Sequence, residues 1–356
     1  MTQKPNIWIF PIEPLDSRYT GQWHKSIPES LNKLTSEFNI HQIDGVQKAT
    51  EVTKGAFLNF ADTNYWKSTQ LINFLELHNS GMTTPNDRFL ITDFWNPIVC
   101  QLKYISDLTN LNWQFHGVAH AGSYDPQDFL GRLIQDKRWV KNLEKSFYHA
   151  YHHLYFATDF HIDLFINGVF GDEYDKQYKL IKSGQPHSSL VQELSKFANM
   201  EKRPLILFPH RVAPEKQPEI FRDLAKSMPQ YEWVVCQDNK LSKDEYHKLL
   251  GESKIVFSAN LQETLGISSM ESILTNTIPL LPDRLSYSEM YSDDFLYDSE
   301  WTTDYDSYIK YKPKLMSKIT NMIDNYESYL PSINKQRERL ISDYLLGDIM
   351  FSQLVK

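Results

Sequence analysis

Two cations in the second half of the chain have the types and spacing of a phosphate-binding pair. Arg211 and Lys216 lie five positions apart, where an apolar run gives way to a short loop and then to a helical pattern. In parallel sheets such a loop lies at the ligand-binding edge, and the free N–H groups of the helix that follows favour an anion. Two fixed cations there can bind a diphosphate and offset the charge that develops as a sugar–phosphate bond breaks. Two solvated surface charges are the alternative interpretation of the pair alone.

Two carboxylates follow in a second loop-to-helix segment. Glu263 and Glu271 lie eight positions apart, and Gly266 between them allows close backbone approach just before Ile267 begins a helical pattern. One carboxylate facing a sugar ring and one facing a ribose would accept hydrogen bonds from hydroxyl groups. The amides of Gly266 and Ile267 would face the diphosphate. For Glu271 alone, ordinary helix capping is an alternative.

The first half offers candidates for contacting an acceptor. Asp93 ends an apolar run and could orient an acceptor hydroxyl, although a helix cap would use the same residue. Arg18, Tyr19 and Trp23 follow the first apolar run, and a cation with aromatic faces suits the stacking of a flat acceptor base. For Trp23, a core anchor of the first helix is the alternative.

The elements that must position these residues alternate along the whole chain. In the first half we expect strands at 6–12, 57–60, 88–94, 112–119 and 154–158, and helices near 24–37, 63–79, 97–108 and 136–152. In the second half we expect strands at 205–210, 231–237, 254–259 and 277–281, and helices at 214–227, 242–251, 267–276 and 304–327. Strands separated by helices predict parallel βαβ units, and continuous apolar runs predict sheets covered on both faces.

The length of 356 residues exceeds what one core usually serves, and the pattern predicts two α/β domains. A polar, charged stretch from Asp172 to Arg203 indicates the boundary. We expect a Rossmann-like N-terminal domain over 1–175, a linker over 176–203 and a second Rossmann-like domain over 204–334. A C-terminal helix over 335–356 is expected to pack across the junction.

Composition narrows the environment and the partners. The net charge of −8 gives no general attraction to nucleic acid or anionic lipid, so a nucleic-acid contact would need a local basic cleft. No apolar stretch has the length of a membrane span, and the N-terminus lacks the pattern of a signal peptide. We therefore expect a cytoplasmic protein that does not contact a membrane, with Cys100 and Cys236 as buried free thiols. The oligomeric state stays open.

Other chemistries lack their motifs. Four histidines lie close together in the sequence, namely His149, His152, His153 and His161. They have no Cys, Asp or Glu at ligand spacing and no H-E-x-x-H motif, so no essential metal is expected. The sequence has no G-x-G-x-x-G after a strand, no Walker A loop and no G-x-S-x-G. We therefore expect no cofactor, and dehydrogenase, NTPase and serine hydrolase activities are not indicated.

The two motifs of the second half together resemble the retaining GT-B glycosyltransferases of the glycogen-synthase-like and mannosyltransferase-like family. The resemblance covers about residues 204–292, with Arg211 and Lys216 preceding the Glu263-x7-Glu271 pair in the expected order. It implies a GT-B fold, two Rossmann-like domains facing a central cleft. It also implies that the cations bind the donor diphosphate, Glu263 contacts the transferred sugar and Glu271 contacts the ribose. The chain departs from the family where His210 replaces the usual glycine.

The resemblance also implies a histidine that touches the sugar, near the end of a strand in the first domain. His116 is the first candidate and His120 the second. A neutral histidine can hydrogen-bond a sugar hydroxyl, and it can move a proton near neutral pH.

Two short fragments are similar to the enzymes that mannosylate queuosine in transfer RNA, namely 209–211 and 284–291. The chain also looks similar to phage glycosyltransferases of modified DNA bases. We therefore expect transfer of a sugar from a nucleotide-diphosphate donor, uridine-linked, with retention of configuration, and a modified base of DNA or RNA as one acceptor. The alternatives are a glycan or small-molecule acceptor, a sugar-nucleotide epimerase, and a GT-B module that binds without turnover.

Overall fold

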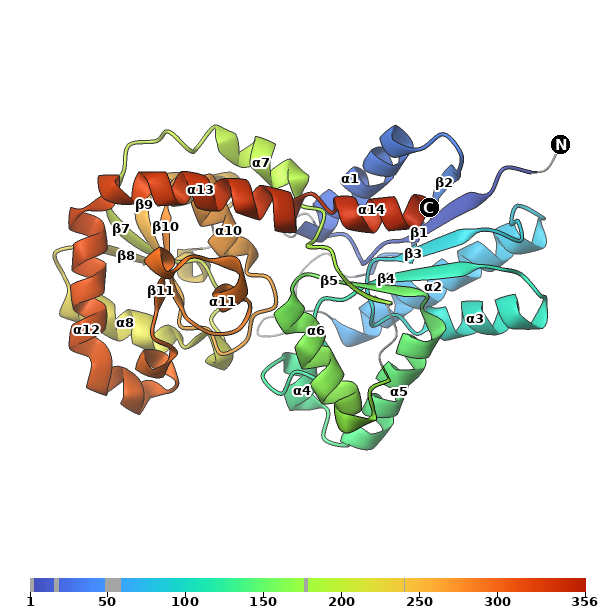
Figure 1. Cartoon of the computed structure of the whole chain (residues 1–356), viewed down its shortest axis with the longest axis horizontal. Helices are drawn as coiled ribbons and strands as arrows, with labels where there is room; N and C mark the ends of the chain where they lie inside the picture. Colours follow the sequence, from blue (N-terminus) through green and yellow to red (C-terminus); the bar gives the residue numbers. More distant parts are fainter. Residues whose placement is uncertain (1–2, 16–18, 49–58, 176–178, 240) are drawn as a thin grey trace. The chain divides into compact units, whose positions relative to one another are not determined.

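The computed structural model describes residues 3–15, 19–48, 59–175, 179–239 and 241–356. The chain divides into two compact units, Met1–His187 with Gly347–Lys356, and Ser188–Leu346 (Figure 1). Each unit contains its own parallel sheet with helices on it.

The first unit holds a six-stranded sheet in the order β2-β1-β3-β4-β5-β6, in which every recorded pairing is parallel. Its strands are β1 (Asn6–Phe10), β2 (Asn39–Gln42), β3 (Arg88–Ile91), β4 (Gln114–Val118), β5 (His153–Phe156) and β6 (Leu180–Lys182). Its α-helices are α1 (Tyr19–Leu34), α2 (Phe60–Asn79), α3 (Ile98–Leu108), α4 (Phe129–Leu133), α5 (Lys137–Ala150), α6 (Asp159–Phe165) and α14 (Asp348–Val355). A π-helical turn, Ile166–Phe170, and a 3₁₀ turn, Gly171–Glu173, follow α6.

The apolar run of β1 explains why both faces of this sheet are covered. Successive side chains of a strand point to opposite faces. Trp8 and Phe10 join the core cluster formed with α2, α3 and α5, whereas Ile7 and Ile9 join the cluster formed with α1 and α14. In Figure 1, α1 and α14 accordingly lie above the strands of this unit, and α3 and α5 lie below them. Helices thus cover both faces of the sheet. Because the strands are parallel, their carboxyl ends lie at one edge of the sheet.

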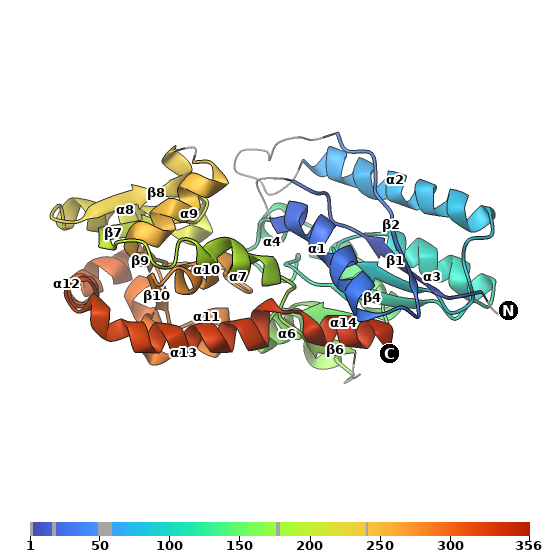
Figure 2. The same ribbon diagram turned by 90° about the horizontal axis from the view of Figure 1, so that it is seen from above.

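The second unit holds a five-stranded parallel sheet in the order β11-β10-β9-β7-β8. Its strands are β7 (Arg203–Phe208), β8 (Glu232–Val235), β9 (Ser253–Phe257), β10 (Ile278–Pro282) and β11 (Leu296–Tyr297). Its α-helices are α7 (Ser188–Ser195), α8 (Pro218–Ser227), α9 (Lys243–Glu252), α10 (Ile267–Leu274), α11 (Ser286–Met290), α12 (Tyr305–Asp324) and α13 (Leu330–Leu340). Figure 2 shows α13 running along one side of this unit, with α8 and α9 at the opposite side.

The predicted α/β class is confirmed, and so are most predicted elements, within a few residues at their ends. The strand predicted at 57–60 is wrong where the structure describes it. Phe60 begins α2, and the Asn59 side chain caps that helix by accepting from the Asp62 amide; 57–58 lie outside the described residues. The edge strands β2 and β6 were not predicted, since both are short and only half-buried, so they lack an apolar run.

The single helix predicted at 335–356 is two helices. A π-helical turn, Ile341–Leu345, and Gly347 separate α13 from α14. Gly347 has a φ of 68°, and a Cβ there would lie 2.9 Å from the Cβ of Pro186, so another residue would be strained and crowded. Arg88 Nη1 of β3 donates to the Leu354 carbonyl, which ties α14 to the first unit.

Candidate functional site

The two predicted motifs of the second unit meet at the carboxyl ends of β7 and β9. These strands are neighbours in the sheet, so the loops that follow them lie together. Lys216 ends a 3₁₀ turn, Pro214–Lys216, and its side chain is 7% exposed. Its Nζ donates to the Gln262 carbonyl at 2.5 Å and lies 3.4 Å from Glu263 Oε2. A cation and a carboxylate 47 positions apart in the sequence are thus in direct contact.

This contact keeps Glu263 ionised. Burial alone would raise the pKa of Glu263, but the Lys216 ammonium and a hydrogen bond from the Thr264 amide hold it below its usual range. A carboxylate in this state only accepts hydrogen bonds. Glu263 can therefore bind a hydroxyl group of a ligand.

The loop between Glu263 and α10 requires glycine at one position. Gly266 has a φ of 80° and precedes the first residue of α10, Ile267. A Cβ at Gly266 would lie 2.9 Å from the Tyr287 ring. The Tyr287 hydroxyl accepts from Asn260 Nδ2 at 3.0 Å, which holds the start of the same loop. The first N–H groups of α10 are presented here, as anion binding at a helix N-terminus requires.

Arg211 is held by a residue that sequence analysis missed. Its Nε and Nη2 lie 2.9 and 2.5 Å from Oε1 of Glu215, a residue that is 1% exposed. The Arg211 side chain is 29% exposed. The only signal in the sequence is the i,i+4 spacing of the pair. Glu215 therefore orients Arg211 from the interior and leaves part of the Arg211 side chain at the surface.

His210, where the resembling family has a glycine, is in no ion pair among the described residues. Burial, helped by the nearby Lys216, lowers its pKa to about 3, so the imidazole is neutral. The ring packs edge-on against Phe208 at 5.1 Å, and Nδ1 lies 3.5 Å from Ser268 Oγ in the first turn of α10. A neutral ring at this position adds polar surface beside Glu263 without adding charge.

Glu271 lies in α10 and faces α9. Its Oε2 accepts from the Tyr246 hydroxyl at 2.7 Å, and its Oε1 lies 3.9 Å from His247 Nε2. The residue is 9% exposed. Sequence analysis singled out neither Tyr246 nor His247.

In the first unit, Asp93 and His120 lie just beyond the ends of the neighbouring strands β3 and β4. Asp93 is 8% exposed, and its Oδ2 lies 2.7 Å from Nζ of Lys67. Burial would raise the pKa of Asp93, but the charge of Lys67 and the hydrogen bond from the Trp95 amide hold it below its usual range. Sequence analysis missed Lys67, which lies in α2 and has no motif around it.

The tautomer of His120 follows from its two contacts. Nε2 lies 2.7 Å from the Thr92 carbonyl, so it must carry the proton, and Nδ1 lies 3.0 Å from the Tyr19 hydroxyl. Burial lowers the pKa of His120 below its ordinary value. A neutral His120 therefore accepts from Tyr19, and this pair can take part in hydrogen bonding to a ligand.

Two other candidates of the first unit, His116 and Trp23, are buried, although the Trp23 ring lies 5.4 Å from the His120 ring. His116 lies within β4 with no exposed surface, and its Nδ1 is 2.7 Å from the Tyr155 hydroxyl in the neighbouring strand. Trp23 is 2% exposed within the core cluster of α1 and α14, so its indole presents no open face for stacking, which favours the core alternative. Arg18 lies outside the described residues.

A second carboxylate of the first unit, Glu13, follows β1 and is 4% exposed. Its Oε2 accepts from the Thr63 hydroxyl at 3.0 Å, and its Oε1 has no hydrogen-bond partner among the described residues. Burial raises the pKa of Glu13. The signal that could have found it is a carboxylate placed directly after an apolar strand.

Glu144 of α5 accepts hydrogen bonds from the loop that follows β4. Its carboxylate accepts from the Ser123 amide and hydroxyl and from Trp95 Nε1, each at 2.8 Å. Glu144 is 1% exposed. It thus connects the loops that follow β3 and β4.

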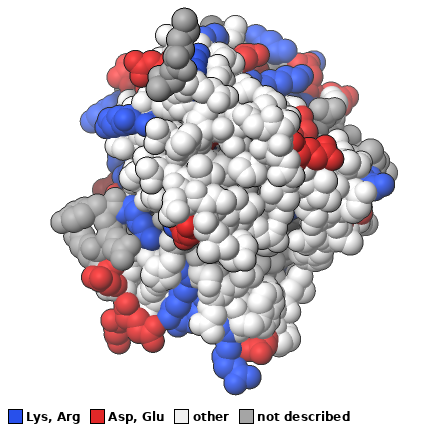
Figure 3. Space-filling view, turned by 90° about the vertical axis from the view of Figure 1, so that its right-hand side faces the viewer, with Lys and Arg blue, Asp and Glu red and all other residues white. Residues whose placement is uncertain are grey.

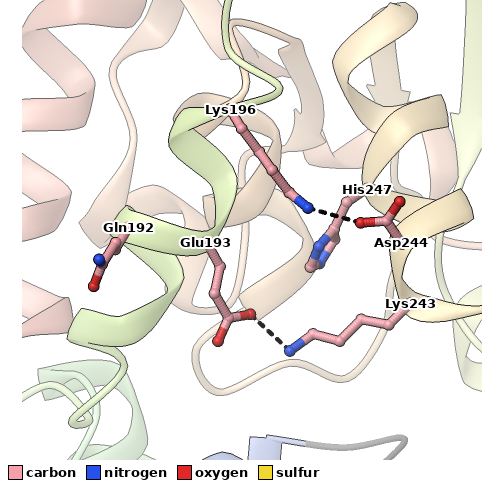
Figure 4. A pocket seen from close by; sticks show the side chains of 6 residues that line it. All are labelled: Gln192, Glu193, Lys196, Lys243, Asp244 and His247. Atoms are coloured by element: carbon pink, nitrogen blue, oxygen red, sulfur yellow. Dashed lines mark hydrogen bonds and ion pairs between the residues drawn. The ribbon is translucent and has the colours of Figure 1, made fainter.

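A surface hollow of about 320 Å³ lies in the second unit between α7 and α9 (Figure 4). Two ion pairs cross it, Lys196 with Asp244 at 2.8 Å and Lys243 with Glu193 at 2.7 Å. None of the predicted site residues lines it. Its charges are paired with one another, so it does not add a binding group to the site.

The described part of the chain offers neither a metal site nor a membrane-spanning helix. It contains no group of three or more His, Cys, Asp or Glu residues arranged to hold a metal ion. Within the same residues, the helices are too short or too polar to cross a bilayer.

Solved structures with this architecture include the catalytic domain of starch synthase IV from Arabidopsis thaliana, bound to ADP and acarbose. It aligns over 99% of this chain and 100% of that chain, with a TM-score of 0.61 and 10% identity. Sucrose-phosphate synthase from Thermosynechococcus elongatus aligns over 99% of this chain and 98% of that chain, with a TM-score of 0.65 and 12% identity. The pneumococcal O-GlcNAc transferase GtfA, in complex with UDP and GlcNAc, aligns over 81% of this chain and 59% of that chain, with a TM-score of 0.52 and 13% identity.

The sequence matches no protein-family model and no curated protein. The structural similarities span nearly the whole chain at very low identity. They confirm the predicted GT-B fold class.

Proposed function

We propose that the chain is a glycosyltransferase that moves a sugar from a nucleoside-diphosphate donor to an acceptor hydroxyl. The observation that carries this proposal is the contact between Lys216 and Glu263 beside the N-terminus of α10. One cation, one ionised carboxylate and free helix amides are the groups that a sugar diphosphate requires.

Each site residue has a role in the proposed reaction. Arg211, Lys216 and the amides of Gly266 and Ile267 bind the diphosphate and stabilise the charge that develops on it as the glycosidic bond breaks. Glu263 accepts a hydroxyl of the transferred sugar. Because the two cations supply the positive charge, the proposal includes no essential metal.

The remaining roles concern the ribose and the acceptor. Glu271 accepts from the donor ribose. Asp93, with His120 and Tyr19, binds the acceptor hydroxyl and orients it. His116 has no place in this assignment, since it has no exposed surface.

The finer statements are extensions of the same proposal. The motif resemblance supports a uridine-linked donor and retention of configuration. A modified base of DNA or RNA is the acceptor that the short sequence matches support, and a glycan or a small molecule is the other. Free Cys100 and Cys236 agree with a reaction in the reducing cytoplasm.

The surface bears on the choice of acceptor. Figure 3 shows the face of the first unit on which the chain enters β1. Among the described residues of this face, Lys and Arg are interspersed with Asp and Glu around an uncharged centre. This face is therefore unsuited to binding a phosphate backbone, and an acceptor in DNA or RNA would have to be contacted elsewhere.

The test is a transfer assay with purified protein. UDP- and GDP-sugars are incubated with DNA or RNA that carries hydroxymethylated or other modified bases, and in parallel with oligosaccharides. A gain of one sugar mass on a digested nucleoside, or on an oligosaccharide, supports the proposal and identifies the acceptor class.

Two variants provide the controls. Lys216→Ala should abolish transfer, whereas Lys226→Ala, which changes an exposed lysine of α8, should leave it intact. Turnover of the donor without an acceptor would indicate an epimerase. Binding of the donor without any turnover would indicate a binding module, and either result would overturn the proposal.

A further inference from the structure

The helix that faces Glu271 begins at a firmly fixed position. The Ser242 hydroxyl accepts from the Glu245 amide at 3.3 Å, and the Glu245 carboxylate accepts from the Ser242 amide at 2.8 Å. This reciprocal capping box fixes the first turn of α9. Tyr246 follows directly, so the backbone that carries its ring is rigid.

Tyr246 makes one strong contact with Glu271. Its hydroxyl donates to Oε2 at 2.7 Å, a charge-assisted hydrogen bond. Burial and the neighbouring carboxylate raise the pKa of Tyr246 well above its ordinary value, so the hydroxyl keeps its proton and donates. His247, at 3.9 Å from Oε1, is beyond hydrogen-bonding distance.

The arrangement leaves acceptor capacity on Glu271. A carboxylate has two oxygens and about four lone-pair sites, and Tyr246 occupies one of them on Oε2. A carboxylate repels phosphate oxygens and accepts from hydroxyl groups, so a sugar hydroxyl suits it and a diphosphate does not. Holding the carboxylate still before binding removes the entropic cost of ordering it in the complex.

We propose that Tyr246 is a positioning residue that holds the Glu271 carboxylate to receive one ribose hydroxyl of a nucleoside diphosphate. The proposal rests on the proposed function, because it takes Glu271 as a donor-binding group. It adds a residue outside both sequence motifs and ties its effect to one part of the ligand.

The experiment measures nucleotide binding to the full-length protein by calorimetry, without acceptor. The probes are UDP, 2′-deoxy-UDP and 3′-deoxy-UDP, with ADP and GDP measured alongside. Removal of the contacted hydroxyl should weaken binding to the wild type. Tyr246→Phe should weaken UDP binding about fivefold to tenfold, which corresponds to the loss of one hydrogen bond.

A merely structural role would not change the selectivity for that hydroxyl. Tyr246→Phe should weaken the deoxynucleotide less than twofold, because the group that Glu271 receives is already absent. In a Glu271→Gln background, Tyr246→Phe should have no further effect, as a double-mutant cycle on a coupled pair requires. The Glu271→Gln background also keeps the contact testable if Tyr246→Phe alone impairs folding.

Tyr308 supplies a matched control. Its hydroxyl donates to Asp223 Oδ2 at 2.6 Å, in the same unit but between α12 and α8. Tyr308→Phe removes the same kind of bond and should leave UDP affinity unchanged.

Two results would overturn the inference while the proposed function stands: UDP affinity within twofold of wild type in Tyr246→Phe, or an equal loss for UDP and both deoxynucleotides. Failure of the wild type to bind UDP, ADP or GDP would overturn the inference together with the proposed function.

Discussion

The buried contact between Lys216 and Glu263 can be tested by removing its cation. Lys216→Met keeps an apolar stem but leaves Glu263 without the ammonium 3.4 Å away. At an effective dielectric constant of about 20, unit charges at that distance attract by about 5 kcal/mol. Glu263 keeps a hydrogen bond from the Thr264 amide at 3.2 Å. We therefore expect the substitution to lower the free energy of opening of this unit by about 2–4 kcal/mol at neutral pH.

The loss of stability caused by Lys216→Met should become smaller as pH falls. In the wild type the depressed pKa of Glu263 stabilises the fold above the unfolded pKa, about 4.3, and this contribution is lost as pH falls through the folded pKa. In Lys216→Met, burial is no longer opposed by the ammonium, so the pKa of Glu263 rises. The variant takes up a proton at higher pH than the wild type does. The difference in stability between the two proteins should therefore shrink as pH falls through the raised pKa of Glu263 in the variant.

Amide hydrogen exchange of peptides from β9, corrected for the intrinsic rate at each pH, reports this sheet separately from the first unit. Lys226→Met, at an exposed position of α8, should cost less than about 0.5 kcal/mol. Lys216→Met combined with Glu263→Gln should regain stability at neutral pH. A cost below about 1 kcal/mol, or one that does not vary with pH, would refute the claim that Lys216 keeps Glu263 ionised.

Two further substitutions test the segments that follow the carboxyl ends of β9 and β3. Gly266→Ala, at a φ of 80° and with its Cβ 2.9 Å from the Tyr287 ring, should cost about 2–3 kcal/mol in β9 exchange, and a cost within 0.5 kcal/mol would show that the loop relaxes. Asp93→Asn leaves the buried Lys67 ammonium without its carboxylate and should cost about 3 kcal/mol in β3 exchange. Asp107→Asn, which breaks an exposed i,i+4 pair, should cost less than about 0.5 kcal/mol, and equal costs for the two would contradict the buried role of Asp93.

The closeness of the two motifs in the second unit could be predicted, because their residues follow the ends of strands. Lys216 and Glu263 each lie in a loop after a parallel strand, and all such loops emerge at one edge of a sheet. The partners could not be predicted in the same way. Glu215 and Tyr246 lie in or beside helices, where a charged or aromatic residue is common, and only the packing shows that one holds Arg211 and the other holds Glu271.

In the first unit, the exact ends of β4 decide which of the two candidate histidines lies outside the strand. The strand predicted at 112–119 is Gln114–Val118, so His116 lies in its middle and His120 lies two residues beyond its end. A sequence pattern gives the period of a strand more firmly than its ends, so either histidine fitted the prediction. Glu13 was passed over because no second motif residue accompanied it.

The charges at the first sheet's carboxyl edge favour binding of an uncharged part of the proposed acceptor. Lys67 is engaged by Asp93 and by the Trp95 carbonyl, so that cation is already neutralised. The pKa of His120 is lowered by burial, which keeps its ring uncharged near neutral pH. Glu13 adds a carboxyl group whose buried Oε1 has no hydrogen-bond partner among the described residues. These groups suit hydroxyl or amine donors of a sugar or a base, whereas phosphate would meet carboxylates there without a free ammonium from Lys67.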